Sequence, residues 1–208
     1  MPFGRGLYAI LDLDRLAGRA VRPLAAALVR GGAVALQIRG KRAGAGAVLA
    51  AAREVVPLCT EAGLPLVVND RPDIARIAGA WGVHVGQTDL GVAQVRAVAP
   101  GCKVGVSTHS PAELSLALAS GADYVGYGPV FETGTKENPE PVQGLGALAE
   151  AARRSTVPVV AIGGVDPIRV AQIARTGAWA AAAISAVDAA PDPEAVARAF
   201  ARAFAEAK

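Results

Sequence analysis

The sequence predicts a closed (β/α)8 barrel, the TIM-barrel fold, with its active site on the rim formed by the carboxyl ends of the strands. Three observations predict this fold. Short apolar runs alternate with longer Ala- and Leu-rich stretches bounded by Gly or Pro, which is typical of βα units. Eight such runs are present, and they are apolar almost throughout, as expected of strands buried on both faces. An open, doubly wound sheet is the structural alternative.

The runs and the intervening helices follow one another along the whole chain. The predicted strands are LYAILDL (7–13), AVALQIR (33–39), PLVVND (65–70), GVHVGQ (82–87), KVGVST (103–108), DYVGYGP (123–129), PVVAIGG (158–164) and AWAAAAIS (178–185). Helical spacing of apolar residues is clearest in 44–62, 111–120, 167–176 and 193–207. No boundary divides the chain, so we expect one domain over residues 1–208.

The composition argues against several classes of protein. Hydrophobic residues make up 52% of the chain and charged residues 19%, which favours a large core. The net charge is +3 and no run of Lys or Arg is interleaved with aromatics, which argues against a nucleic-acid partner. The first residues lack a signal pattern, and Asp12 and Asp14 interrupt the first apolar run. We therefore expect a cytoplasmic protein with no membrane partner. Cys59 and Cys102 are interpreted as reduced thiols, and the sequence indicates no oligomeric state.

Two carboxylates stand at the predicted mouths of neighbouring strands. Asp70 ends the motif VVND and Asp89 ends the motif GQTD. Carboxylate oxygens beside cations suit Mg²⁺, which commonly bridges protein carboxylates and substrate phosphates. The alternative is that each carboxylate caps the helix that follows, over 72–78 and near 91–98. Because the two residues share a rim with several cations, we favour the metal site.

Two other groups of residues suit phosphate. In QIRGK, Gln37, Arg39 and Lys41 alternate along a strand end and form a row of donors. Arg offers bidentate geometry and Lys a point charge, as a diphosphate requires. In AIGG (161–164) and AIS (183–185), the small residues permit close backbone approach to a monophosphate. A solvated strand end and tight turns are the respective alternatives.

A polar segment, YGPVFETGTKENPEP (127–141), interrupts the apolar pattern after the sixth run. Loops of this length in compact domains are functional or disordered, and this one follows a strand at the predicted rim. We interpret the segment ENPEPVQGL, which follows TGTK, as a lid. The two histidines have neither metal nor triad spacing. His84 is interpreted as a packed strand residue, whereas His109 lies at a strand end within reach of the rim.

Taken together, these motifs resemble those of thiamine phosphate synthase over almost the whole chain. The matching segments, in family order, are QIRGK, VVND, GVHVGQTD, GVSTHS, DYVGYGPVFETGTK, VPVVAIGG and AISAV. The resemblance implies a TIM-barrel transferase of thiamine biosynthesis that uses Mg²⁺ as its cofactor. Such an enzyme joins hydroxymethylpyrimidine diphosphate to a thiazole phosphate and releases diphosphate. Its partners are small phosphorylated molecules.

The resemblance also assigns roles to individual positions. It implies pyrimidine-diphosphate contacts at Gln37, Arg39, Lys41, Asn69, Ser107 and Lys136, metal ligands at Asp70 and Asp89, and thiazole-phosphate contacts at Thr133, Thr135, Gly164, Ile184 and Ser185. The implied catalytic group is Arg39, Lys41, Ser107 and Lys136. These donors suit a dissociative substitution, because a departing diphosphate accumulates negative charge that they would stabilise.

Three positions depart from the family pattern. Leu11 precedes Asp12 where Thr is common, Glu132 replaces a Pro, and Trp179 replaces a smaller residue. Glu132 adds a negative charge beside the predicted diphosphate site. The sister family, thiazole tautomerase, shares the barrel and often has Glu there, so isomerisation is the second hypothesis. Pro129 and the Thr-x-Thr-Lys pattern favour the synthase. A phosphate-binding barrel without catalysis is the third hypothesis.

Overall fold

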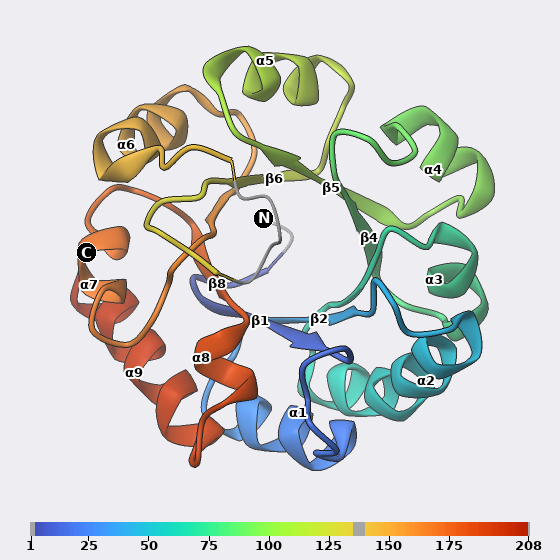
Figure 1. Cartoon of the computed structure of the whole chain (residues 1–208). Helices are drawn as coiled ribbons and strands as arrows, with labels where there is room; N and C mark the ends of the chain where they lie inside the picture. Colours follow the sequence, from blue (N-terminus) through green and yellow to red (C-terminus); the bar gives the residue numbers. More distant parts are fainter. Residues whose placement is uncertain (1–2, 135–139, 208) are drawn as a thin grey trace.

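The structure, a computed structural model, describes residues 3–134 and 140–207 and confirms the closed eight-stranded barrel (Figure 1). All strands are parallel and pair in chain order. Their bounds are β1 (Gly6–Asp12), β2 (Ala35–Arg39), β3 (Leu66–Asn69), β4 (Gly82–Val85), β5 (Lys103–Thr108), β6 (Tyr124–Tyr127), β7 (Val159–Ala161) and β8 (Ala180–Ala183). Strand β1 pairs with β8, with Gly6 opposite Ala180, so the open sheet is excluded.

The helices form a ring around the strands, as Figure 1 shows. Their bounds are α1 (Val21–Arg30), α2 (Ala45–Ala62), α3 (Pro72–Ala78), α4 (Val92–Val98), α5 (Pro111–Ala119), α6 (Gly144–Arg154), α7 (Val170–Ala174), α8 (Ser185–Asp188) and α9 (Pro193–Glu206). The short helix α8 lies between β8 and α9. None of the described helices is both long and apolar enough to cross a membrane.

The eight predicted strands agree with the observed ones in number and order, but several of them extend too far at the rim. The seventh predicted strand, 158–164, ends at Ala161, because Gly163 and Gly164 have φ values of 98° and 63°, outside the β region. The predicted helix 167–176 shortens to α7. Both differences fall where the backbone turns away from the barrel, and an apolar pattern does not reveal that turn.

Alternation along the strands divides the buried residues into two layers. Outward-facing residues such as Leu7, Leu36 and Ile38 pack against the helices. Inward-facing residues fill the barrel and comprise Phe3, Tyr8, Ile10, Ala35, Val67, Tyr124, Val160, Ala180 and Ala182. Phe3 precedes β1, and its ring centroid lies 5.9 Å from that of Tyr8 and 5.5 Å from that of Tyr124. The amino end of the barrel is therefore closed by aromatic rings.

Gly105 makes room for one of these rings. A Cβ atom at this position would lie 2.1 Å from Cζ of Tyr124, which is far inside van der Waals contact. Gly105 pairs with Tyr124 across the β5–β6 ladder, so the small residue on β5 lets the large residue on β6 cross the barrel interior. The position of the Tyr124 hydroxyl follows from this packing.

Asp188, at the end of α8, is a buried carboxyl group with no standard hydrogen-bond partner for either oxygen within the described residues. Burial, followed by the negative charge of Asp12, raises its pKa from the ordinary value to about 7. The backbone of Asp12 and the guanidinium groups of Arg15 and Arg19 act in the opposite direction. Arg19 also donates to the carbonyl oxygen of Asp188 at 2.6 Å and to that of Ala190 at 3.1 Å.

We predict that Asp188→Asn stabilises the fold at alkaline pH. The folded-state pKa is raised, so the folded protein binds more protons than the unfolded chain between about pH 4 and pH 7, and stability falls as pH rises through that window. The neutral amide removes this penalty. Urea unfolding should show a gain of about 2 kcal/mol at pH 8 and little gain at pH 4. The exposed Asp192→Asn is the control, and an equal gain at both pH values would contradict the prediction.

Candidate active site

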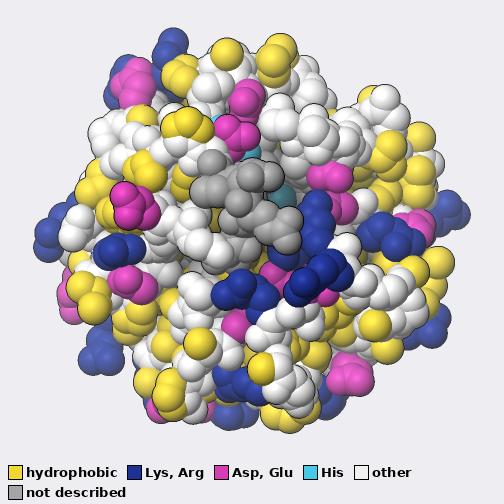
Figure 2. All heavy atoms as spheres, in the orientation of Figure 1, with side chains coloured by type: hydrophobic (Ala, Val, Ile, Leu, Met, Phe, Trp, Pro, Cys, Tyr) yellow, Lys and Arg dark blue, Asp and Glu magenta, His cyan; other side chains and the backbone are white. Residues whose placement is uncertain are grey.

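One pocket opens at the carboxyl ends of the strands, and the predicted site residues meet there. Those in the described part of the chain all line it: Gln37, Arg39, Lys41, Asn69, Asp70, Asp89, Ser107, Thr133, Gly164, Ile184 and Ser185. Thr135 and Lys136 lie outside the described residues, as does the first part of the predicted lid. Figure 2 shows Lys and Arg side chains gathered on the β1–β3 side of this end, with Asp and Glu among them.

Arg39 is held at the pocket wall by Asp12. The two residues are register partners in the β1–β2 ladder, and Arg39 Nη1 pairs with Asp12 Oδ2. The Asp12 residue is fully buried, and the side chain of Arg39 is 17% exposed. A guanidinium has five N–H donors, so one carboxylate leaves donors for an anion in the pocket. Asp12 thus orients a predicted phosphate donor.

Asp70 and Asp89 face the pocket and do not cap helices. The N-cap of α3 is Arg71 and that of α4 is Gly91, and neither makes a side-chain cap hydrogen bond. The backbone N–H of Asp70 donates to His84 O at 2.8 Å, which holds the residue in the left-handed region at φ 61°. The alternative in which the two carboxylates act as helix caps is therefore wrong.

The two carboxyl groups are close enough to perturb one another. Burial raises the pKa of Asp70, the ion pair with Lys41 Nζ opposes that shift, and the neighbouring Asp89 adds to it. Asp89 Oδ2 accepts the backbone N–H of Gly86 at 2.9 Å, which fixes its orientation. Among the residues that the structure describes, no group of three or more His, Cys, Asp or Glu side chains is arranged to hold a metal. A cation here would have two carboxylates as protein ligands, an all-oxygen set that fits a hard ion such as Mg²⁺.

The opposite side of the pocket is built by the ends of β7 and β8. A Cβ atom on Gly164 would lie 2.4 Å from Glu132 O, so only glycine lets the loop after β6 approach this closely. Arg169 fastens the two loops together, because its Nη1 donates to Gly164 O at 2.8 Å and its guanidinium lies 5.0 Å from the centroid of the Phe131 ring. Thr133 thereby lines the same pocket as Gly164 and Ser185.

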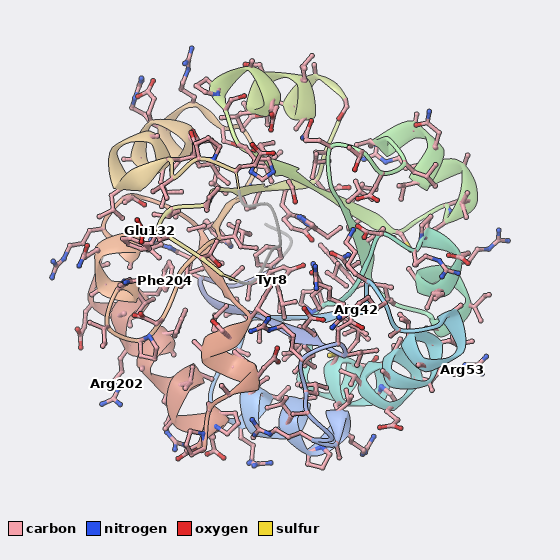
Figure 3. All side chains as sticks on the ribbon, viewed as in Figure 1. Tyr8, Arg42, Arg53, Glu132, Arg202 and Phe204 are labelled. Atoms are coloured by element: carbon pink, nitrogen blue, oxygen red, sulfur yellow. The ribbon has the colours of Figure 1, made fainter. Side chains whose placement is uncertain are left out.

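Glu132 does not contribute a charge to the pocket. Its side chain is exposed and is not among the pocket-lining residues. Figure 3 shows it on the α7 side of the barrel, away from the axis. The concern that this departure from the family pattern places a carboxylate beside the diphosphate site therefore does not apply to the described conformation.

The sequence interpretation missed the hydroxyl groups of Tyr8 and Tyr124 at the floor of the pocket, which join the predicted residues Gln37 and Ser107 through His84. Gln37 Nε2 donates to Tyr8 Oη at 2.8 Å, and Tyr8 Oη lies 2.9 Å from Tyr124 Oη. This series of hydrogen bonds continues from Tyr124 Oη to His84 Nδ1 at 3.1 Å and from His84 Nε2 to Ser107 Oγ at 2.9 Å. His84 is thus not only a packed strand residue, because it also lines the pocket. The sequence does contain a signal for this position. Val83 and Val85 face outward, so strand alternation turns the side chain of His84, which lies between them, into the barrel.

His109 lies at the rim, as expected from its place at the end of β5. Its Nδ1 is 2.6 Å from Gly128 O, and its backbone N–H donates to Glu113 Oε2 at 2.7 Å. A carbonyl oxygen only accepts hydrogen bonds, so Nδ1 carries the proton. The ring is fastened to the loop after β6 and borders the pocket.

Comparisons with known proteins agree with this geometry. The family model described as thiamine monophosphate synthase matches residues 7–187. A thiamine-phosphate synthase of Anaeromyxobacter dehalogenans is 48% identical over 200 residues, which cover 96% of this chain and 87% of that protein. One from Methanoculleus marisnigri is 41% identical, covering 99% and 98%.

One solved structure supports the same assignment, and a second shares only the fold. A thiamine phosphate pyrophosphorylase from Pyrococcus furiosus superposes with a TM-score of 0.88 at 31% identity, covering 97% of this chain and 96% of that one. A tryptophan synthase structure from Mycobacterium tuberculosis, at 18% identity and a TM-score of 0.73, shares the fold alone. From the matched family model and these relatives, we conclude that the chain belongs to the thiamine monophosphate synthase family.

Proposed function

We propose that this transferase condenses hydroxymethylpyrimidine diphosphate with a thiazole phosphate to give thiamine phosphate and diphosphate. The observation that carries the proposal is that one pocket gathers cations, a pair of carboxylates and a glycine-bordered loop junction. These are separate sites for a diphosphate, a divalent cation and a monophosphate. Both substrates are small phosphorylated molecules.

The diphosphate would bind on the β2 side of the pocket. Arg39, oriented by Asp12, offers paired donors, and Lys41 stands beside Asp70 at the mouth. Gln37 and Asn69 border the same wall, and Ser107 supplies a hydroxyl from β5. Negative charge on the diphosphate grows as its bond to the pyrimidine methylene breaks. Donors fixed in place beforehand therefore stabilise the transition state more than the bound substrate.

We further propose that Asp70 and Asp89 hold Mg²⁺. The support is the all-oxygen donor set and the mutual closeness of two carboxylates, one of which has a raised pKa. When bound, Mg²⁺ would neutralise charge on the diphosphate oxygens. Lys41, which pairs with Asp70 in this structure, is free to turn toward the diphosphate once another cation faces that carboxylate.

The thiazole phosphate would bind between the loop after β6 and the ends of β7 and β8. Thr133 offers a hydroxyl, Gly164 leaves space for close backbone approach, and Ile184 and Ser185 begin α8. A neutral ring nitrogen has a free electron pair, so it attacks the pyrimidine methylene without a general base. The pocket's role in this step is to align the two substrates and to exclude water from a reactive cation.

The two other hypotheses from the sequence receive no support from the comparisons. The family model and the relatives reported above carry the synthase or pyrophosphorylase name. Neither thiazole isomerisation nor ligand binding without catalysis requires two proposed phosphate sites. The proposed diphosphate site on the β2 side would lie beside the paired carboxylates, in addition to the proposed site at the ends of β7 and β8. The full set of site groups on one rim favours the two-substrate reaction.

We predict that the purified protein, supplied with Mg²⁺ and both precursors, forms thiamine phosphate and releases an equal amount of diphosphate. Asp89→Asn should lower kcat by about a hundredfold or more, because one carboxylate of the proposed cation site is lost. Glu150→Gln, an exposed carboxylate on α6, is the matched control and should retain wild-type turnover. Thermal unfolding of both variants checks that the barrel is intact. Thiazole isomerisation without diphosphate release would contradict the proposal.

We also predict that Arg39→Lys lowers kcat about tenfold or more, although the charge is conserved. The lysine keeps an ion pair with Asp12 within reach but loses the planar pair of donors that meets a diphosphate. Arg42→Lys is the matched control, because Arg42 is exposed near the same rim and does not line the pocket (Figure 3). Steady-state kinetics with the pyrimidine diphosphate varied measures the effect. Equal activity of the two variants would show that Arg39 is not a diphosphate donor.

A further inference from the structure

Five polar side chains form a continuous path across the barrel beneath the pocket. The path runs Gln37, Tyr8, Tyr124, His84, Ser107, with successive heavy-atom distances of 2.8, 2.9, 3.1 and 2.9 Å. Tyr8 and Tyr124 are 2% and 1% exposed, so their hydroxyls must find partners within the protein. Figure 3 shows Tyr8 close to the barrel axis. Gln37 and Ser107, at the two ends, are both proposed substrate contacts.

The direction of the hydrogen bonds along this path is determined at the Gln37 end. The Gln37 amide nitrogen faces Tyr8 Oη, and an amide nitrogen donates but does not accept. The hydroxyl proton of Tyr8 must therefore point to its other partner, Tyr124 Oη. Since Tyr124 accepts that proton, its own hydroxyl points to His84 Nδ1. Each donor along the path thus fixes the next one.

The direction at Tyr124 selects one tautomer of His84. Nδ1 accepts a hydrogen bond and is unprotonated, so a neutral ring carries its proton on Nε2 and donates to Ser107 Oγ. The ring orientation is fixed by packing, with the His84 and Tyr124 centroids 5.5 Å apart. Ser107 Oγ then accepts the hydrogen bond from His84 Nε2, so the Ser107 proton is left for a ligand in the pocket.

We propose that Tyr8, Tyr124 and His84 are positioning residues that commit the Ser107 hydroxyl to donating into the pocket. A serine hydroxyl that rotates freely can present a proton or a lone pair, and the lone pair would repel a diphosphate oxygen. When the His84 N–H occupies one of the two lone pairs of Ser107 Oγ, the serine proton cannot point to His84 and is available to an anionic oxygen in the pocket. The inference rests on the proposed function only for the identity of the ligand that Ser107 meets.

The tautomer can be measured directly without substrate. The chain has two histidines, so long-range ¹H–¹⁵N correlation spectra recorded at alkaline pH contain two imidazole patterns. We expect the Nε2–H form for His84 and the Nδ1–H form for His109, whose Nδ1 faces Gly128 O. His109 thus serves as an internal reference. An Nδ1–H tautomer at His84 in the wild-type protein would overturn the inference.

Tyr124→Phe tests whether the direction matters for catalysis. It keeps the ring that packs against Gly105 but removes the proton donated to His84 Nδ1. We expect His84 to populate both tautomers and kcat to fall about tenfold, with the KM for the pyrimidine diphosphate changed less than about threefold. A fall in kcat with little change in KM indicates loss of a contact made in the transition state. A general loosening of the pocket would change KM as well. Unchanged tautomer and kcat would refute the role.

Tyr127→Phe is the matched control. Tyr127 is an equally buried tyrosine on the same strand, but it belongs to the outer layer that faces the helices. The substitution should leave the His84 tautomer and kcat unchanged. Tyr8→Phe provides a second variant should Tyr124→Phe fold poorly, and it should change kcat in the same direction. His84→Gln, whose amide can donate to Ser107, should retain more turnover than His84→Leu. An inactive wild-type protein would refute the proposed function, while its His84 tautomer would still decide this inference.

Discussion

Closure of the barrel through the β1–β8 ladder is the constraint on which the site depends. It places Gly6 beside Ala180, while the β1–β2 ladder on the other side of β1 places Asp12 beside Arg39. Residues that are far apart in the chain thereby meet on one rim, and their approach is set by the register of the ladders. An open sheet with the same strands would leave β1 and β8 at opposite edges, with the predicted monophosphate and diphosphate walls separated.

Arg39 and Lys41, the Arg and Lys side chains that line the pocket within the described residues, are each paired with a carboxylate, and this pairing determines how they can act. Arg39 is fixed by the fully buried Asp12, so it presents its remaining donors without the entropic cost of ordering a long side chain. Lys41, half-exposed and paired with Asp70, is more mobile and can change partner. The pocket therefore has one fixed donor, Arg39 at its wall, and one donor that can change partner, Lys41 at its mouth.

Much of the fold was predictable because it depends on the spacing of apolar residues and on the order of strands and helices along the chain. Eight apolar runs gave the strand count, and the motifs at their ends gave most of the rim residues. The polar floor was not predicted. Tyr8, Tyr124 and His84 lie on three different strands, and their contact depends on the radius and register of the closed barrel. The role of Asp12 likewise required the β1–β2 register, since a strand-end Asp alone does not specify its partner.

The division of the barrel interior into an aromatic amino half and a polar carboxyl half explains why one hydrogen-bonded path can influence the site. The rings of Phe3, Tyr8 and Tyr124 pack against one another below, and within the described residues the two tyrosine hydroxyls form hydrogen bonds with one another, with Gln37 and with His84. In a water-filled interior each hydroxyl could reorient independently, and no direction would be transmitted from Gln37 to Ser107. Dense packing at the floor is thus what lets the buried amide of Gln37 determine how Ser107, on the other side of the barrel, meets an anion.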